Sequence, residues 1–136
     1  VIVGDGEERD VLKRKTAEDG MEDKITFLGV LPNPYPLMKK AFLFLHTARF
    51  EGYGIIVKEA ALLHLPMVLT NFNTATQIIT PETTGLIAEM NSESVFIQME
   101  RLISNQTLRR KLIENLEKEV SQQVNEIEKF YRLIEI

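Results

Sequence analysis

The sequence has 136 residues, the length of one ordinary domain, and it is 44% hydrophobic and 26% charged, as expected of a folded globular protein. Its formal net charge of −4 is mixed along the chain without a basic stripe, so we expect no nucleic-acid partner. The absence of cysteine excludes disulfides and thiolate metal sites and is typical of the reducing cytoplasm, and no apolar run approaches the ~20 residues that span a bilayer.

The first part of the chain predicts strands and a helix in alternation. Residues 1–3, "VIV", have the pattern of a buried strand, and a helix is expected over residues 7–17 after the turn "GDGEE". A second strand is expected over 24–29. Residues 31–41 contain three prolines, so they begin as a constrained loop and become helical near Pro36. Because a buried strand opens the chain without a lead-in, we expect a fragment truncated on its N-terminal side.

The middle of the chain continues the alternation. Residues 42–47, "FLFLHT", form a continuous apolar run, which predicts a strand covered on both faces. A helix over 55–63, a strand over 66–70, the short segment "QIIT" and a last strand over 85–89 follow. This spacing of strands and helices indicates βαβ units, and we therefore expect an α/β fold with a Rossmann-like parallel sheet flanked by helices.

After Asn91 the pattern becomes helical, with Ser92 as the expected N-cap. Apolar residues at helical spacing define two successive faces and then a long amphipathic helix to the end of the chain. These positions are Val95, Met99, Leu102 and Ile103; Leu108, Leu112, Ile113 and Leu116; and Val120, Val124, Ile127, Phe130, Tyr131 and Ile134. The sequence thus predicts one domain over residues 1–136, with a βαβ core to about residue 90 and C-terminal helices over 91–136.

The turn "GDGEER", residues 4–9, lies where an α/β fold binds phosphate, between a strand and a helix. A dinucleotide fingerprint needs a third glycine, and Arg9 occupies that position. The turn therefore disfavours an NAD site. Two interpretations remain, a tight turn that happens to line a cleft and a ligand-contacting turn through Gly4 and Gly6.

The stretch "RFEGYGIIVKEA", residues 49–60, is more informative. Its two glycines, Gly52 and Gly54, let the backbone approach a ligand, and the helix that follows points free amide groups and its positive dipole end at that place. Glu59 lies roughly 6 Å further along the helix axis. Residues three and four positions away from it are apolar, so it has no helical cation partner, and a ribose diol is a candidate ligand. The alternative is that Glu59 reaches solvent beside Lys58.

Four stretches together resemble a known family. Residues 4–6, 27–29, 51–68 and 83–90 resemble, in this order, the C-terminal half of the GT-B glycosyltransferases of family 4, which are retaining enzymes that use nucleotide sugars. The centre of the resemblance is the acid-x7-acid motif from Glu51 to Glu59. Residues 33–41, "NPYPLMKKA", are further similar to bacterial members that build capsular or cell-surface polysaccharides.

The resemblance implies a role for each matching residue. It places Glu51 at the donor sugar as the catalytic residue and Glu59 on the ribose. It gives the sugar and diphosphate contacts to the backbone amides of Tyr53, Gly54 and Ile55, and the base pocket to Gly29 and Val30. Together with Gly52, Gly4 and Gly6, whose turns let the backbone approach a ligand, these are the predicted substrate-binding residues. It implies transfer of a hexose without a metal or other cofactor.

The resemblance also implies what this chain lacks. The acceptor domain and an upstream Arg/Lys pair for the phosphates belong to the N-terminal side of such enzymes, so we expect these residues alone to bind donor weakly and to turn over nothing. We expect the full enzyme to be cytoplasmic, to contact a membrane peripherally, and to bind a nucleotide sugar. A non-catalytic nucleotide-binding or receiver-like α/β regulatory module is the alternative, although it would need an acidic cluster at strand ends, where only Asp5 is suitably placed.

Three positions depart from the family pattern. His64 replaces a glycine, and we expect it to end its helix in a left-handed conformation, which histidine tolerates better than most residues. Thr76 or Gln77 stands where an acidic residue is frequent, and Phe42 replaces a frequent aspartate. Apart from these departures, His46 and His64 lack partners at metal-ligand spacing, so no metal site is expected.

Overall fold

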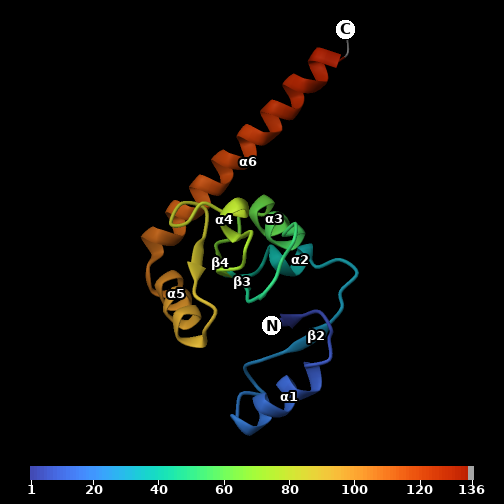
Figure 1. Ribbon diagram of the computed structural model, residues 1–136, viewed down its shortest axis with the longest axis vertical. Coiled ribbons are helices and arrows are strands. Elements are labelled where there is room, and N and C mark those ends of the chain that lie inside the picture. Colours follow the sequence, from blue (N-terminus) through green and yellow to red (C-terminus); the bar gives the residue numbers. More distant parts are fainter. Residues whose placement is uncertain (135–136) are drawn as a thin grey trace. The chain divides into compact units, whose positions relative to one another are not determined.

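The computed structural model describes residues 1–134, except for the side chains at 126 and 130–134. Strands and helices alternate from β1 (Ile2–Val3) to β5 (Leu86–Ala88), and two helices follow, α5 (Ser92–Ser104) and α6 (Gln106–Ile134) (Figure 1). All described strand pairs are parallel, which confirms the predicted α/β fold. The chain forms two compact units, Val1–Pro36 and Leu37–Ile136, and each is described by itself below.

The first unit is a small βαβ element made of β1 (Ile2–Val3), α1 (Arg9–Glu18) and β2 (Phe27–Gly29). Its two strands are shorter than expected. The prediction that residues 1–3 are buried is wrong, because their side chains are 41–71% exposed. The physical reason lies within the unit, where β1 pairs with β2 alone and α1 buries only Thr16.

The second unit holds a three-stranded sheet with β4 (Met67–Thr70) between β3 (Phe44–His46) and β5 (Leu86–Ala88). All four residues of β4 are buried. Successive side chains of a strand point to opposite faces, so Met67 and Leu69 join one apolar cluster and Val68 joins another. A middle strand covered on both faces is continuously apolar for this reason.

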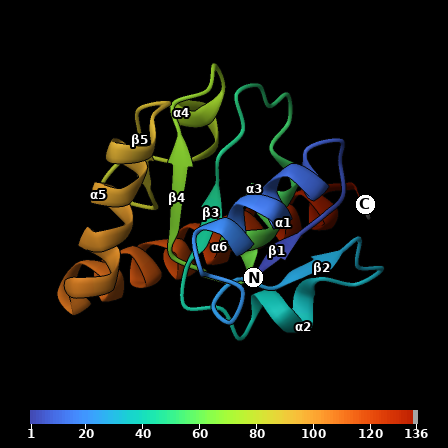
Figure 2. The same cartoon turned by 90° about the horizontal axis from the view of Figure 1, so that it is seen from below.

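Helices supply the two covering layers of this sheet. The cluster around Met67 includes Val57 and Ala60 of α3 (Ile55–Leu62), and the cluster around Val68 includes Leu102 of α5 (Ser92–Ser104). Figure 2 shows α5 beside β5 and β4, with which it is in contact. Two further short helices are α2 (Tyr35–Met38) and α4 (Ala75–Ile78).

The edge strand β3 differs from its prediction. We expected "FLFLHT" to be covered on both faces, but Phe44 and His46 are only half-buried and Leu45 is 36% exposed. The prediction is wrong because an apolar run does not reveal whether a strand lies at the centre or at the edge of a sheet. In the described part of this unit, β3 has β4 as its only strand neighbour.

The last helix, α6 (Gln106–Ile134), packs its first half against α3 and α5 through buried Leu112 and Leu116. Beyond that point it runs on past the sheet of its unit (Figure 1), and Val124 and Ile127 are about half exposed. The side chains of Phe130, Tyr131 and Ile134, predicted on the same apolar face, lie outside the described residues. Along residues 1–134, none of the helices combines the length and apolar composition needed to cross a bilayer.

The helix ends can be compared with those predicted from local sequence signals. His64 has a φ of +55°, as predicted, and the N–H groups of His64 and Leu65 bond back to Ala61 and Ala60 in a Schellman-type ending. The N-cap of α5 is Asn91, whose side chain accepts the N–H of Ser94 at 2.8 Å, so the prediction of Ser92 is wrong by one residue. Ile103, predicted to face the core, is 54% exposed because the neighbouring Leu102 takes the buried position.

Candidate functional site

The predicted site residues fall into both units. Gly4, Gly6, Gly29 and Val30 lie in the first unit, whereas Glu51 through Ile55 and Glu59 lie in the second. The structure therefore defines two local groups, each of which has its own geometry.

In the first group, backbone bonds tie the turn after β1 to the end of β2. The N–H of Gly4 donates to the carbonyl of Gly29 at 2.7 Å, and both glycines have a positive φ. The N–H of Gly6 donates to the Asp5 carboxylate at 2.9 Å, and Asp5 also pairs with Arg9 at 3.2 Å. The Gly4 and Gly6 amides are thus already engaged, while the Val30 side chain is 72% exposed.

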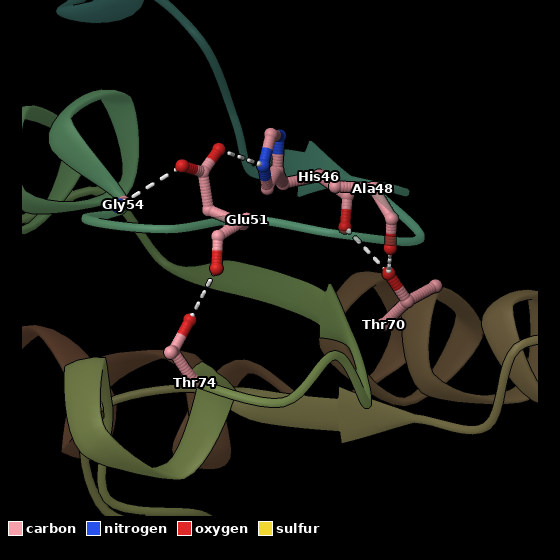
Figure 3. A network of polar contacts seen from close by, with 6 residues as sticks. All are labelled: His46, Ala48, Glu51, Gly54, Thr70 and Thr74. Carbon is pink, nitrogen blue, oxygen red and sulfur yellow. Dashed lines mark hydrogen bonds and ion pairs between the residues drawn. The ribbon is translucent and has the colours of Figure 1, made fainter.

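In the second group, the Glu51 carboxylate is held by two donors from different elements (Figure 3). Oε1 accepts the backbone N–H of Gly54 at 3.1 Å, and Oε2 lies 3.3 Å from Nε2 of His46. The Glu51 and His46 side chains are 26% and 21% accessible, so the pair is largely sheltered. Glu51 therefore connects the end of β3 with the start of α3.

His46 is itself fixed by aromatic neighbours. Its ring stacks on Phe44 with centroids 6.0 Å apart and an interplanar angle of 14°. The ring of Phe72 meets it edge-on at 5.9 Å and 88°. The contact between His46 and Glu51 was not predicted, because no regular periodicity relates the last residue of a strand to a loop residue five positions later. His46 was weighed only as a metal ligand.

Two threonines anchor the backbone of the loop that carries Glu51 (Figure 3). Thr70 Oγ1, at the end of β4, donates to the carbonyl of Ala48 at 2.6 Å. Thr74 Oγ1, at the start of α4, donates to the carbonyl of Glu51 at 2.7 Å. The loop is therefore fastened at one point to the end of β4 and at another to the start of α4.

These contacts lower the pKa of Glu51 from its ordinary value. The main cause is the hydrogen bond from the Gly54 amide; partial burial opposes it, and the hydrogen bond and charge of His46 act in the same direction as Gly54. The carboxyl group is therefore ionised at neutral pH and acts as a hydrogen-bond acceptor.

The start of α3 is formed by Gly54 as the N-cap, with a φ of +58°. Gly54 is buried, and a Cβ added to it would lie 2.2 Å from Cδ1 of Ile78. No side chain caps this helix, so in the described part of the chain the N–H groups of its first turn, Ile55 to Val57, have no side-chain acceptor. The resemblance assigned the Gly54 amide to the donor, whereas here Glu51 accepts it.

The surface around this helix start is unusually apolar. Three large side chains are exposed within six residues, Phe50 at 85%, Tyr53 at 81% and Ile55 at 66%. Gly52 is also exposed, and Glu59, on the second turn of α3, is partly buried. These exposed apolar side chains, close together in the sequence, make this loop a candidate for ligand contact if they form one continuous patch. Phe50 is a candidate that no sequence motif indicated.

A cavity of about 430 Å³ lies at the carboxyl ends of the strands in the second unit. It is lined by residues 47–49, Thr70 and the residues around the start of α5, including Met90 and Phe96. None of the predicted site residues lines it. Across residues 1–134, the described side chains form no group of three or more His, Asp or Glu residues able to hold a metal ion.

Comparison with known proteins identifies relatives over most of this chain. The family described as "Glycosyl transferases group 1" matches residues 1–119. The alpha-D-kanosaminyltransferase of Streptomyces kanamyceticus is 26% identical over 118 residues, which cover 85% of this chain and 31% of that protein. A lipopolysaccharide core biosynthesis mannosyltransferase of Rhizobium meliloti is 33% identical over 78 residues, or 56% of this chain and 22% of that protein.

Solved structures show the same fold. The Anabaena protein HepE in complex with UDP superposes with a TM-score of 0.79 at 22% identity, over 98% of this chain and 39% of that one. Its complex with UDP-glucose gives a TM-score of 0.73 at 26% identity, over 88% and 35%. The chain thus spans about a third of the length of the proteins that it matches over most of its own length.

Proposed function

Because this chain belongs to the glycosyl transferases group 1 family, we propose that it is the donor-binding part of a glycosyltransferase. The donor would be a nucleotide-diphosphate sugar, and the reaction would transfer a hexose with retained configuration to an acceptor hydroxyl, as the family 4 resemblance implies. The HepE structures are complexes with UDP and with UDP-glucose, which supports a nucleotide-sugar donor for this chain.

The observation that carries this proposal is the ionised Glu51 beside an uncapped helix start. The free N–H groups and positive dipole end of α3 form a seat for the diphosphate. Glu51, fixed by Gly54 and His46, faces the same place with acceptor capacity left for sugar hydroxyl groups. One helix terminus would therefore hold both parts of the donor.

The remaining assignments follow the resemblance. Glu59, one turn further along α3, would accept the two ribose hydroxyls. Gly29 and Val30 would line the base pocket, and Gly4 and Gly6 the adjoining turn. As the resemblance implies, we also propose transfer without a metal ion.

The chemistry would be electrostatic. As the bond between the sugar and the diphosphate breaks, negative charge grows on the departing diphosphate. Helix-end N–H groups held in place before the reaction stabilise that charge without reorganising. Removal of a single donor of this type from other enzymes costs about 10²–10³ in rate.

The biological setting is a second step of the proposal. The relative from Rhizobium meliloti bears a name from lipopolysaccharide core synthesis, which supports a role in building a bacterial surface polysaccharide. We propose that an acceptor domain, with any peripheral membrane contact, belongs to the part of the relatives that this chain does not cover.

The test is a binding screen by isothermal titration calorimetry with UDP-glucose, GDP-mannose, UDP and NAD. We expect at least one nucleotide sugar to bind more tightly than NAD, and the 136-residue chain alone to show no transfer. Two results would refute the proposal. One is that NAD binds as tightly as the nucleotide sugars, and the other is that the full-length protein binds none of these ligands.

A further inference from the structure

The Glu51 carboxylate is only partly used by its protein partners. Each carboxylate oxygen can accept about two hydrogen bonds. Gly54 takes one position on Oε1 and His46 takes one on Oε2. The backbone amide of Gly52 is a further, weaker donor to this carboxylate. At least one acceptor position of the carboxylate therefore remains for a ligand, and its direction depends on how the carboxylate plane is held.

The two partners fix that plane unequally. The Gly54 amide is part of the backbone and can bond to either oxygen as the carboxylate rotates. His46 belongs to another element, the end of β3. Its hydrogen bond to Oε2 therefore holds the Glu51 carboxylate in one rotational position. The geometry around His46 makes it suitable for this role, because Phe44 stacks on its ring and Phe72 closes its edge.

We propose that His46 is a positioning residue that orients Glu51 toward the sugar hydroxyl groups of the donor. This inference rests on the proposed function. It adds to that function a residue that contributes to recognition of the sugar without contacting the donor or the acceptor. His46 acts through Glu51, so its loss should weaken recognition of the sugar while leaving recognition of the nucleotide unchanged.

The test compares UDP with UDP-glucose in titration calorimetry on the full-length protein. His46→Leu keeps an apolar side chain between the two aromatic rings but removes the donor to Glu51. We expect the affinity for UDP-glucose to fall about 5- to 10-fold, the effect of one lost hydrogen bond to a charged group, while the affinity for UDP stays within about 2-fold.

His46→Gln is the rescue variant. The side-chain amide of glutamine places an N–H at a reach similar to that of Nε2 of histidine. We expect this variant to recover most of the lost preference for UDP-glucose over UDP. His64→Asn is the matched control, because it removes the other histidine of the chain, at the end of α3, with a residue that also tolerates a positive φ. It should leave both affinities unchanged.

The outcomes separate the inference from the proposed function. If the wild-type protein prefers UDP-glucose to UDP and His46→Leu retains that preference, the inference is wrong and the proposed function stands. An equal loss for both ligands in His46→Leu would also overturn it, because that result marks a purely structural residue. If the wild type binds no nucleotide sugar of the panel, the proposed function itself fails.

Discussion

The carboxylate of Glu51 accepts the backbone N–H of Gly54 at 3.1 Å, and Gly54 is the residue from which α3 begins. The first acid of the motif is thus also the contact that closes the loop in front of the helix. The proposed ligand site and the start of α3 share one hydrogen bond, and the predictions below separate the two roles.

Gly54→Ala should destabilise the protein strongly. The new methyl group would lie 2.2 Å from Ile78 Cδ1, and the φ of +58° is costly for a residue with a Cβ. We expect a loss of about 2–4 kcal/mol in the free energy of unfolding, from overpacking and left-handed strain together. Urea unfolding followed by circular dichroism measures it.

Gly52→Ala is the control for that measurement. A Cβ at Gly52 meets no atom within 4 Å, and its φ lies outside the left-handed region. Its free energy of unfolding should change by no more than about 0.5 kcal/mol, as for other surface substitutions. Equal losses in both variants would show that Gly54 has no special packing role.

Glu59→Gln should weaken UDP and UDP-glucose by the same factor, because both ligands contain the ribose that Glu59 is proposed to bind. We expect about 10-fold or more for the loss of the charged acceptor. Glu51→Gln should weaken UDP-glucose alone. Lys58→Gln changes the exposed neighbour of Glu59 and serves as the control in the same calorimetric series. A change in the ratio of the two affinities in Glu59→Gln would contradict the ribose assignment.

Glu51 should contribute an acid-sensitive part of the stability. Its pKa is lowered in the folded protein, chiefly by the Gly54 amide, so the unfolded chain binds its proton more readily. The stabilisation is complete above the unfolded-state pKa of roughly 4.3 and is lost as the pH falls through the folded value. Urea midpoints between pH 6 and pH 3 should fall more steeply in the wild type than in Glu51→Gln. Parallel curves would show that the contact has no energetic weight.

Arg101 and Glu82 form a two-pronged ion pair between α5 and the loop before β5, with both N–O distances at 2.8 Å. The hydrogen bond with Arg101 lowers the pKa of Glu82, partial burial opposing it, and the same bond raises the pKa of Arg101. Because both side chains are about half exposed, we expect a coupling free energy of only about 0.2–1 kcal/mol at pH 7.

A double-mutant cycle with Glu82→Gln and Arg101→Met measures this coupling. It should fall toward zero as the pH drops through the lowered pKa of Glu82, where the carboxyl group becomes protonated. The raised pKa of Arg101 has no effect in this acidic range, since the guanidinium stays charged throughout it. A coupling that persists once Glu82 is protonated would mean that the contact depends on shape and not on charge.

Much of the fold could be predicted from the sequence because its signals are local. The alternation of strands and helices, the helix that follows Gly54 and the left-handed His64 all follow from residue type and spacing. The exposure of β1 and of Leu45 could not be predicted in this way, because burial depends on which strands become neighbours.

The candidate site shows the same division. The sequence allows four site residues to be predicted, because they lie around a helix start: Glu51, Gly52, Gly54 and Glu59. The contact between His46 and Glu51 is invisible in the sequence, because it depends on how the loop after β3 folds back toward that strand. The engaged amides of Gly4 and Gly6 were missed for a similar reason, since their acceptors are fixed by the folded turn.

The double use of Glu51 matters for how related sequences are interpreted. A descendant of this chain that had abandoned catalysis would still gain from keeping the acid, because it joins the end of β3 to the start of α3. Selection for folding alone would then preserve half of the motif. In related sequences, Glu51 by itself is therefore weak evidence of catalytic turnover, because folding alone is a sufficient reason to retain it.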